Sequence, residues 1–251
     1  GAGSDPGRLR RSGLARTLRC VAAGIVVAID GPAGSGKSSV SRAVATKLGY
    51  RYLDTGAMYR AVTWAAVEAG LDPDDSATIG AWITGPEAPT IRSGTDPESP
   101  TIAVDGTDVS APIRGAEVTA NVSAVSAVPQ VRTLLVESQR AEAAAAVPGI
   151  VLEGRDIGSV VLPDADVKIF LTADPAVRAQ RRAAEVEPGS DAAAIAATEQ
   201  SLRARDTKDS TRALSPLTKA DGAVEVDTTH LTFDEVVATV IDVVKEREPS
   251  R

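Results

Sequence analysis

The stretch Gly31-Pro32-Ala33-Gly34-Ser35-Gly36-Lys37-Ser38 fits the pattern G-x-x-x-x-G-K-[ST] at every fixed position. Before it, residues 25–30 form an apolar run of strand length; after it, residues 39–48 place apolar side chains on one helix face. Glycines in such a loop let successive backbone N–H groups turn toward one anion, and the following helix adds the positive end of its dipole. This order predicts a phosphate-binding loop, with a ligand-free glycine turn as the alternative.

Two side chains of this loop have chemistry suited to a nucleotide. We expect Lys37 to reach the β- and γ-phosphates and the Ser38 hydroxyl to bind Mg²⁺. The predicted nucleotide-binding residues are Gly31, Pro32, Ala33, Gly34, Ser35, Gly36, Lys37, Ser38 and Ser39.

The composition excludes several classes of protein. Of the 251 residues, 43% are hydrophobic and 24% are charged, as in ordinary globular proteins. The net charge of −7 argues against a general nucleic-acid binder, and no apolar run is long enough for a membrane helix. Cys20 is the only cysteine, which excludes an internal disulfide and a cysteine metal cluster. We therefore expect a cytoplasmic monomer without a nucleic-acid or membrane partner.

Residues 1–24 differ from the rest of the chain because they are rich in arginine and carry one acid, Asp5. Their composition partly resembles a mitochondrial presequence, but Pro6 and scattered glycines would break an amphipathic helix. We expect a disordered extension or a remnant of expression, and we place the folded domain at residues 25–247.

Short apolar runs alternate with helical periodicity along this domain. Thr55 is expected to cap the second helix and Gly70 to end it. The alternation predicts an α/β fold, a five-stranded parallel sheet with helices on both faces. Strands are predicted at residues 25–30, 51–53, 149–153, 167–171 and 223–227. Helices are predicted at residues 39–48, 55–69, 72–84, 113–127, 129–146, from 174 onward, 191–205 and 233–247.

Prolines accumulate between residues 85 and 111. Short β-like runs lie at residues 90–92, 101–104 and 107–109, and Asp105-Gly106 between the last two is a hairpin turn signal. The segment therefore predicts a small antiparallel insert outside the parallel sheet.

Arginines follow several of the predicted strands. Active sites of parallel sheets lie at the carboxyl ends of the strands, so these side chains are expected to meet at one edge. Phosphoryl transfer between two nucleotides gathers negative charge there, and cations must stabilise it. The candidates are Arg60, Arg155, Arg178, Arg181, Arg182, Arg205 and Arg212.

Four motifs resemble those of the bacterial cytidylate kinases, in the same order and at comparable spacing. They are residues 31–38, residues 53–60 (LDTGAMYR), residues 153–158 (EGRDIG) and residues 205–212 (RDTKDSTR). The resemblance covers roughly residues 25–247 and implies the P-loop nucleoside monophosphate kinase fold. It implies a core at residues 25–55 and 146–247, an acceptor-nucleotide insert at about 56–145 and a short lid at about 174–190.

The resemblance also implies an activity and a set of site residues. The reaction is direct, in-line transfer of the γ-phosphoryl group from ATP, with Mg²⁺, to CMP or dCMP. The implied catalytic residues are Lys37, Arg155 and three lid arginines, Arg178, Arg181 and Arg182. The implied acceptor site consists of Arg60 and Arg155 for the phosphate, Arg205 and Asp209 for the ribose, Ser123, Arg132, Asp156 and Arg212 for the base, and Thr55 and Tyr59.

The base reading has its own chemical reason. The 4-amino group of cytosine is a donor that the Asp156 carboxylate can accept, whereas uracil would present an acceptor there and leave the carboxylate unpaired.

Two positions depart from the family, which often has Asp where Glu153 stands and Ser where Thr55 stands. Both substitutions keep the functional group, so the assignment is unaffected.

Other interpretations remain. Thr218-Lys219-Ala220-Asp221 resembles a guanine-reading motif of GTP-dependent switches, but it does not follow a predicted strand. A UMP/CMP kinase, an adenylate kinase and an ATP-binding module without catalysis are nearer alternatives. Asp30 is a candidate for indirect contact with Mg²⁺, and the single histidine, His230, is expected at a helix entry, away from the chemistry.

Overall fold

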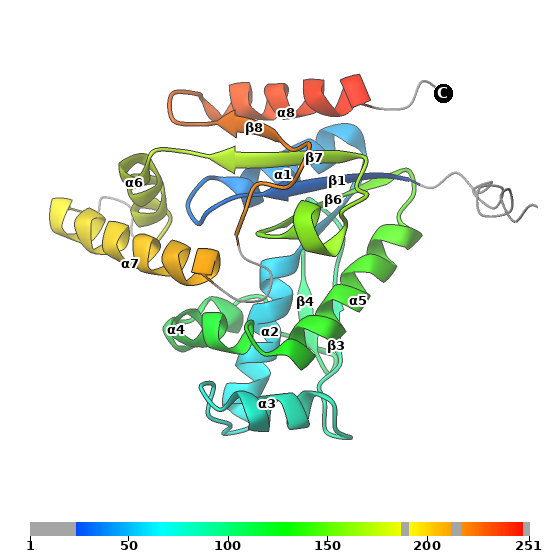
Figure 1. The fold of residues 1–251 in the computed structure, drawn as a ribbon, viewed down its shortest axis with the longest axis vertical. Helices are drawn as coiled ribbons and strands as arrows, with labels where there is room; N and C mark the ends of the chain where they lie inside the picture. Colours follow the sequence, from blue (N-terminus) through cyan, green and yellow to red (C-terminus); the bar gives the residue numbers. More distant parts are fainter. Residues whose placement is uncertain (1–23, 187–190, 212–216, 248–251) are drawn as a thin grey trace, which may run out of the picture.

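The computed structural model describes residues 24–186, 191–211 and 217–247. Five parallel strands form its main sheet, in the spatial order β2-β6-β1-β7-β8, as Figure 1 shows. The α/β class and the parallel sheet are thereby confirmed. The strands are β1 (Ile25–Asp30), β2 (Arg51–Asp54), β6 (Gly149–Gly154), β7 (Val167–Thr172) and β8 (Val224–Asp227).

The register of the sheet brings the polar ends of three strands together. β1 lies between β6 and β7, and Asp30 at its end pairs with Gly154 and Phe170. On the other side of β6, Asp54 at the end of β2 pairs with Glu153. The loops that follow β1, β2 and β6 therefore leave the sheet at the same edge.

Helices cover both faces of the sheet because the side chains of its central strand alternate between them. Val27 and Ile29 belong to one core cluster, which includes residues of α1 (Lys37–Leu48) and α8 (Phe233–Arg247). Ala28 belongs to the other, with residues of α2 (Thr55–Glu68) and α5 (Pro129–Ala145). Strands buried on both faces need covers on both sides, as predicted.

The predicted insert is a three-stranded antiparallel sheet. It consists of β3 (Ile91–Ser93), β4 (Ile102–Val104) and β5 (Thr107–Asp108), in that spatial order. Asp105 and Gly106 connect the last two strands with φ values of 50° and 82°, as a two-residue hairpin requires. The insert also contains α3 (Ser76–Ile83), the short η1 (Pro112–Arg114) and α4 (Ala116–Val125).

Three helix starts differ from the expectation. The helix expected at residues 113–127 is divided into η1 and α4, which begins at Ala116 because Gly115 has an extended ψ of 161°. The helix expected from residue 72 begins at Ser76, because Asp75 caps it by accepting a bond from Thr78 N (3.0 Å). The helix expected to be capped by Thr55 is capped by Asp54, which accepts from Ala57 N (2.9 Å), and Thr55 is its first helical residue.

Two further helices lie beside the loop that follows β1 (Figure 1). They are α6 (Pro175–Val186) and α7 (Ala192–Thr211), and they pack against each other. α7 also touches α4 of the insert, and it extends beyond the expected end at residue 205. No helix among the described residues is long and apolar enough to cross a membrane.

Candidate functional site

The loop of residues 31–38 has a backbone that two of its glycines make possible. Gly34 has a φ of 75°, and a Cβ there would lie 2.8 Å from the carbonyl oxygen of Arg178. Gly36, at the N-terminal end of α1, has a φ of 85°. Since α1 begins at Lys37, its first N–H groups and its positive dipole end face the loop. This is the backbone geometry of an anion site.

The polar side chains of the loop turn back onto its own backbone. The Lys37 ammonium donates to the carbonyl oxygen of Pro32 (2.7 Å), and the buried Ser35 hydroxyl donates to the same oxygen (3.0 Å). Ser38 is exposed and lines a cavity beside the loop. Lys37 is thus held over the loop, where it can meet a phosphate.

Asp30 is buried at the end of β1 and holds the turn that follows β6. Its Oδ1 accepts from Ile157 N (2.9 Å) and its Oδ2 from Gly158 N (2.8 Å). Burial raises the pKa of this carboxyl from 3.8 to about 6, although these bonds and the Lys37 charge oppose the rise. Both of its oxygens therefore serve the backbone around Arg155 and Asp156.

Glu153, in contrast, keeps one oxygen unused. The Tyr52 hydroxyl donates to Oε1 (2.8 Å), whereas Oε2 is buried without a hydrogen-bond partner among the described residues. Burial, followed by the charge of Asp54, raises the pKa of Glu153 from 4.5 to about 7, against the opposing effects of Lys37, Ser38 and Tyr52.

These groups fit a Mg²⁺ ion. A Ser38 hydroxyl near a carboxylate with an unused oxygen is an all-oxygen donor set. Mg²⁺ usually takes only one or two protein ligands and fills the rest of its shell with water and substrate phosphate. The described residues hold no cluster of three or more His, Cys, Asp or Glu side chains suited to a metal, and such an ion needs none.

Guanidinium groups from distant segments gather next to the loop. Arg60 of α2 donates to Ile113 O (3.1 Å) and Thr119 Oγ1 (3.0 Å) in the insert. Burial lowers the pKa of Arg60, and the charges of Arg182, Arg114 and Arg155 lower it further. Arg155 donates to Gly31 O (3.2 Å), so this group adjoins the loop itself. Positive charges held close together repel each other, so the binding of an anion between them is favoured.

Arg132 of α5 and Asp156 form a buried ion pair through Nη2 and Oδ2. Only 7% of each side chain is exposed, and the guanidinium lies over the Tyr59 ring, 5.5 Å from its centre. Thr55 is buried nearby and donates from its hydroxyl to Glu153 O (2.7 Å). Ser123 is half-buried in α4, where its carbonyl oxygen accepts a bond from Ser126.

The three expected lid arginines occupy three different environments. Arg178 is buried and donates to Ala33 O in the loop (3.0 Å). Arg181 donates to the hydroxyl and carbonyl oxygens of Thr228 (both 2.8 Å), beyond the end of β8. Arg182 lies close enough to Arg60 to lower its pKa. Of these three, Arg178 reaches the loop and Arg182 faces the Arg60 group.

Part of the expected acceptor site lies outside the description. Arg205 and Asp209 belong to α7, but their side chains are not among the described ones. Arg212 lies outside the described residues altogether.

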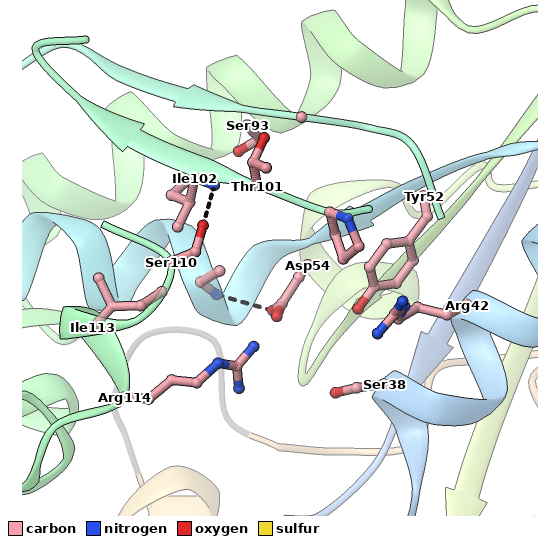
Figure 2. A pocket seen from close by; sticks show the side chains of 13 residues that line it. Ser38, Arg42, Tyr52, Asp54, Ser93, Thr101, Ile102, Ser110, Ile113 and Arg114 are labelled. Carbon is pink, nitrogen blue, oxygen red and sulfur yellow. Dashed lines mark hydrogen bonds between the residues drawn. The ribbon is translucent and has the colours of Figure 1, made fainter. Parts of the chain in front are cut away.

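A cavity joins the loop to the insert (Figure 2). Ser38, Arg42 and Tyr52 line it from the core, and Asp54 and Arg114 face it from the ends of β2 and η1. Sequence reasoning missed Arg42 and Arg114 because neither belongs to a motif. The one available signal was that Arg114 is the basic residue in the last turn of η1.

The residues of the guanine-like motif are engaged elsewhere. Lys219 pairs with Glu225 of β8 (2.9 Å), and the Asp221 side chain is exposed on the loop before that strand. Neither residue is among those that line the cavity.

Comparisons with known proteins agree with this geometry. The family model "Cytidylate kinase" matches residues 27–246. A cytidylate kinase of Streptomyces avermitilis is 56% identical, over 96% of this chain and 99% of its own length. Those of Streptomyces coelicolor and Nocardia farcinica are 55% and 54% identical, over 90% and 89% of this chain and 95% and 94% of theirs.

Proposed function

This chain belongs to the cytidylate kinase family, and we propose that it transfers the γ-phosphoryl group of ATP to CMP or dCMP, giving ADP and CDP or dCDP. The observation that carries the proposal is that Arg155 binds the loop that holds Lys37, while Arg155 and Arg182 both lie close enough to Arg60 to lower its pKa. A site for two phosphorylated substrates needs cations from several directions, and these three come from separate parts of the chain.

The loop of residues 31–39 binds the donor. Its N–H groups surround the β-phosphate, and Lys37 leaves Pro32 O to bridge the β- and γ-phosphates. Ser38 and the unused oxygen of Glu153 would hold Mg²⁺, which neutralises charge on the phosphate oxygens when it is bound. Asp30 keeps the loop and the Arg155 turn in register through its two backbone bonds.

The insert and the turn after β6 bind the acceptor. Arg60 and Arg155 take its phosphate, whose negative charge relieves their mutual repulsion. Arg205 and Asp209 bind the ribose, as the family resemblance implies. Thr55 keeps β6 and α2 aligned through its bond to Glu153 O.

Base selection falls to the buried pair. Arg132 orients Asp156 so that the carboxylate accepts from the 4-amino group of cytosine, while Arg132 itself is a donor suited to O2 or N3. Ser123 and Arg212 complete the contacts to the base, and Tyr59 supports the Arg132 guanidinium from below. Uracil would place an acceptor against Asp156, which the closed site penalises.

The transfer itself is direct and in line, and it requires no covalent intermediate. The positions of the two phosphates and the surrounding positive charge supply most of the catalysis. The single histidine, His230, is exposed between β8 and α8, and the proposed transfer gives it no role. The lid, about residues 174–190, excludes the water that would otherwise hydrolyse ATP.

An assay of ADP release with CMP, dCMP, UMP and AMP as acceptors tests the proposal. We expect activity that depends on Mg²⁺ and is at least about tenfold higher in kcat/KM for CMP than for UMP, because the 4-amino group of cytosine satisfies Asp156 and the 4-oxo group of uracil does not. A preference for AMP would indicate an adenylate kinase. ATP binding without acceptor-dependent ADP release would indicate a module without catalysis, and GTP hydrolysis without any acceptor would indicate a switch protein.

A further inference from the structure

One carboxylate outside the expected site residues touches the phosphate-binding loop. Asp206 of α7 accepts from the backbone N–H of Ala33 through Oδ1 (3.4 Å). Its other oxygen, Oδ2, pairs with Nη1 of Arg178 (2.5 Å). The same Arg178 nitrogen donates to Ala33 O (3.0 Å), so Asp206 and Arg178 together bind both the backbone N–H and the backbone carbonyl of Ala33 in the loop.

This contact is more than a surface ion pair. Only 8% of the Arg178 side chain and 19% of the Asp206 side chain are exposed. Arg178 is held at a third point by Ala173 O (3.2 Å), and its backbone packs against Gly34, where a Cβ would come within 2.8 Å of the Arg178 carbonyl oxygen. The start of α6 is therefore fixed to the loop, and Asp206 is the residue through which α7 joins that unit.

α7 also reaches the acceptor side of the molecule. The helix touches α4 of the insert, whose residue Thr119 binds Arg60. Asp206 stands directly after Arg205 and three residues before Asp209, the two residues proposed for the acceptor ribose. One helix thus carries an attachment to the donor loop and the residues assigned to the acceptor.

We propose that Asp206 is a positioning residue that couples donor binding to acceptor binding. The inference rests on the proposed function of Arg205 and Asp209. CMP held by α7 restricts the motion of that helix, and Asp206 then keeps Ala33 and Arg178 in the arrangement that the donor phosphates require. The ligand that binds first bears the entropy cost of ordering α7 and the loop, so the second binds more tightly. Because coupling is reciprocal, ATP must tighten CMP binding by the same factor.

Calorimetric titrations of the full chain test this coupling. CMP is titrated with and without a saturating β,γ-imido analogue of ATP and Mg²⁺, and the analogue is titrated with and without saturating CMP. We expect each ligand to tighten the other by at least about fivefold, the lower end of ordinary allosteric coupling. In Asp206→Asn, which keeps the side-chain volume but loses the charge, we expect both ratios to fall to within about twofold of one, because without its charge residue 206 no longer holds Arg178 and Ala33 together.

Glu199→Gln is the matched control. Glu199 lies on the same helix and pairs with Arg203 of that helix (2.6 Å), whose side chain is 67% exposed, and not with a residue of the loop. We expect this variant to keep the coupling of the unaltered protein. Should Asp206→Asn not fold, Asp206→Glu takes its place, since the added methylene moves the carboxylate away from Ala33 N and must reduce the coupling.

Three results would overturn the proposal. They are ratios near one in the unaltered protein, unchanged ratios in a folded Asp206 variant, and equal losses in the Asp206 and Glu199 variants. CMP-dependent ADP release together with any of them would leave the proposed function standing. Absence of CMP binding to the unaltered protein would overturn the proposed function and this coupling with it.

Discussion

The two nucleotide sites proposed for this protein are built by different means. The donor side is mostly backbone: residues 31–38 are contiguous, and Gly34 and Gly36 at positive φ shape the loop before α1 begins. The acceptor side is mostly side chain, and its described members, among them Arg60, Arg132 and Arg155, stand on separate elements. A site made of one short loop can be recognised as a motif in the sequence. A site made of arginines far apart in the chain forms only when the chain has folded.

The largest expected effect comes from removing the one essential side chain of the donor loop. In Lys37→Ala we expect kcat to fall by at least about 10²-fold, because no other side chain of the loop carries positive charge to the γ-phosphate. The free energy of unfolding should change by less than about 3 kcal/mol, since Lys37 loses one hydrogen bond from a charged donor, to Pro32 O. Steady-state ADP release and urea unfolding measure the two quantities.

Lys47→Ala is the control for this experiment. Lys47 lies exposed in the last turn of the same helix, and its loss should leave kcat unchanged. Turnover of Lys37→Ala within a few-fold of the unaltered protein would contradict the proposed donor site.

A smaller effect, of a different kind, is expected on the acceptor side. Asp156→Ala leaves the buried Arg132 guanidinium without its partner, which should cost about 3–5 kcal/mol of unfolding free energy. The same change should lower the preference for CMP over UMP in kcat/KM by at least about tenfold. Asp156→Ala is therefore expected to lower both the preference for CMP and the free energy of unfolding. Lys37→Ala is expected to lower mainly kcat.

The double variant Arg132→Met/Asp156→Leu separates the two losses. Replacing both members of a buried ion pair by apolar residues removes the unpaired charge, so most of the stability should return. The preference for CMP should not return, because no group is left to accept from the 4-amino group. A preserved CMP preference in either variant would remove Asp156 from base selection.

The smallest expected effect concerns the pH dependence of stability. It distinguishes Glu153 from Asp30, the other buried carboxylate behind the donor loop. Glu153 has a pKa of about 7 in the folded protein and an ordinary value of 4.5, so the folded state holds a proton that the unfolded state has lost between these values. Its contribution to the free energy of unfolding should therefore decline as the pH rises from about 4.5 to 7, by about 3 kcal/mol, and stay constant above. Glu153→Gln carries no such proton and should lack this decline.

Urea unfolding at pH 5 and pH 8 without Mg²⁺ measures this difference between the two proteins. Asp30, whose pKa is raised to about 6, is present in both and cancels in the comparison. Equal pH dependence in the two proteins would show that Glu153 stays ionised and that its unused oxygen has a partner in solution.

Local sequence predicted the elements better than their ends. The five strands and the closing helix lie where the periodicity placed them, because burial on both faces leaves a continuous apolar run that no loop would carry. The predicted cap of α2, Thr55, was wrong because Asp54 and Thr55 are both good capping residues. The choice depends on Glu153 O, nearly a hundred residues away, which accepts the Thr55 hydroxyl (2.7 Å).

The expected site residues divide in the same way. The donor loop followed from its pattern and its flanking strand and helix. Among the arginines, Arg155 and Arg182 lie close enough to Arg60 to lower its pKa, whereas Arg181 binds Thr228. The sequence predicted no role for Arg114 or Asp206. Arg114 lines the cavity and Asp206 binds the loop because of how η1 and α7 pack. The roles of all the expected site residues stay predictions, and the side chains of Arg205, Asp209 and Arg212 lie outside the described ones.

By itself, the sequence determined the kind of chemistry: a glycine loop before a helix can hold phosphate whatever surrounds it, because its own N–H groups make the bonds. It also determined the parallel sheet that directs the arginines to one edge. The tertiary structure alone decided which side chains share a partner. It left Glu153 with an unused oxygen, buried Arg132 with Asp156, and joined Asp206 to Ala33. Such contacts depend on distances of a few ångströms between residues far apart in the chain, which no local pattern encodes.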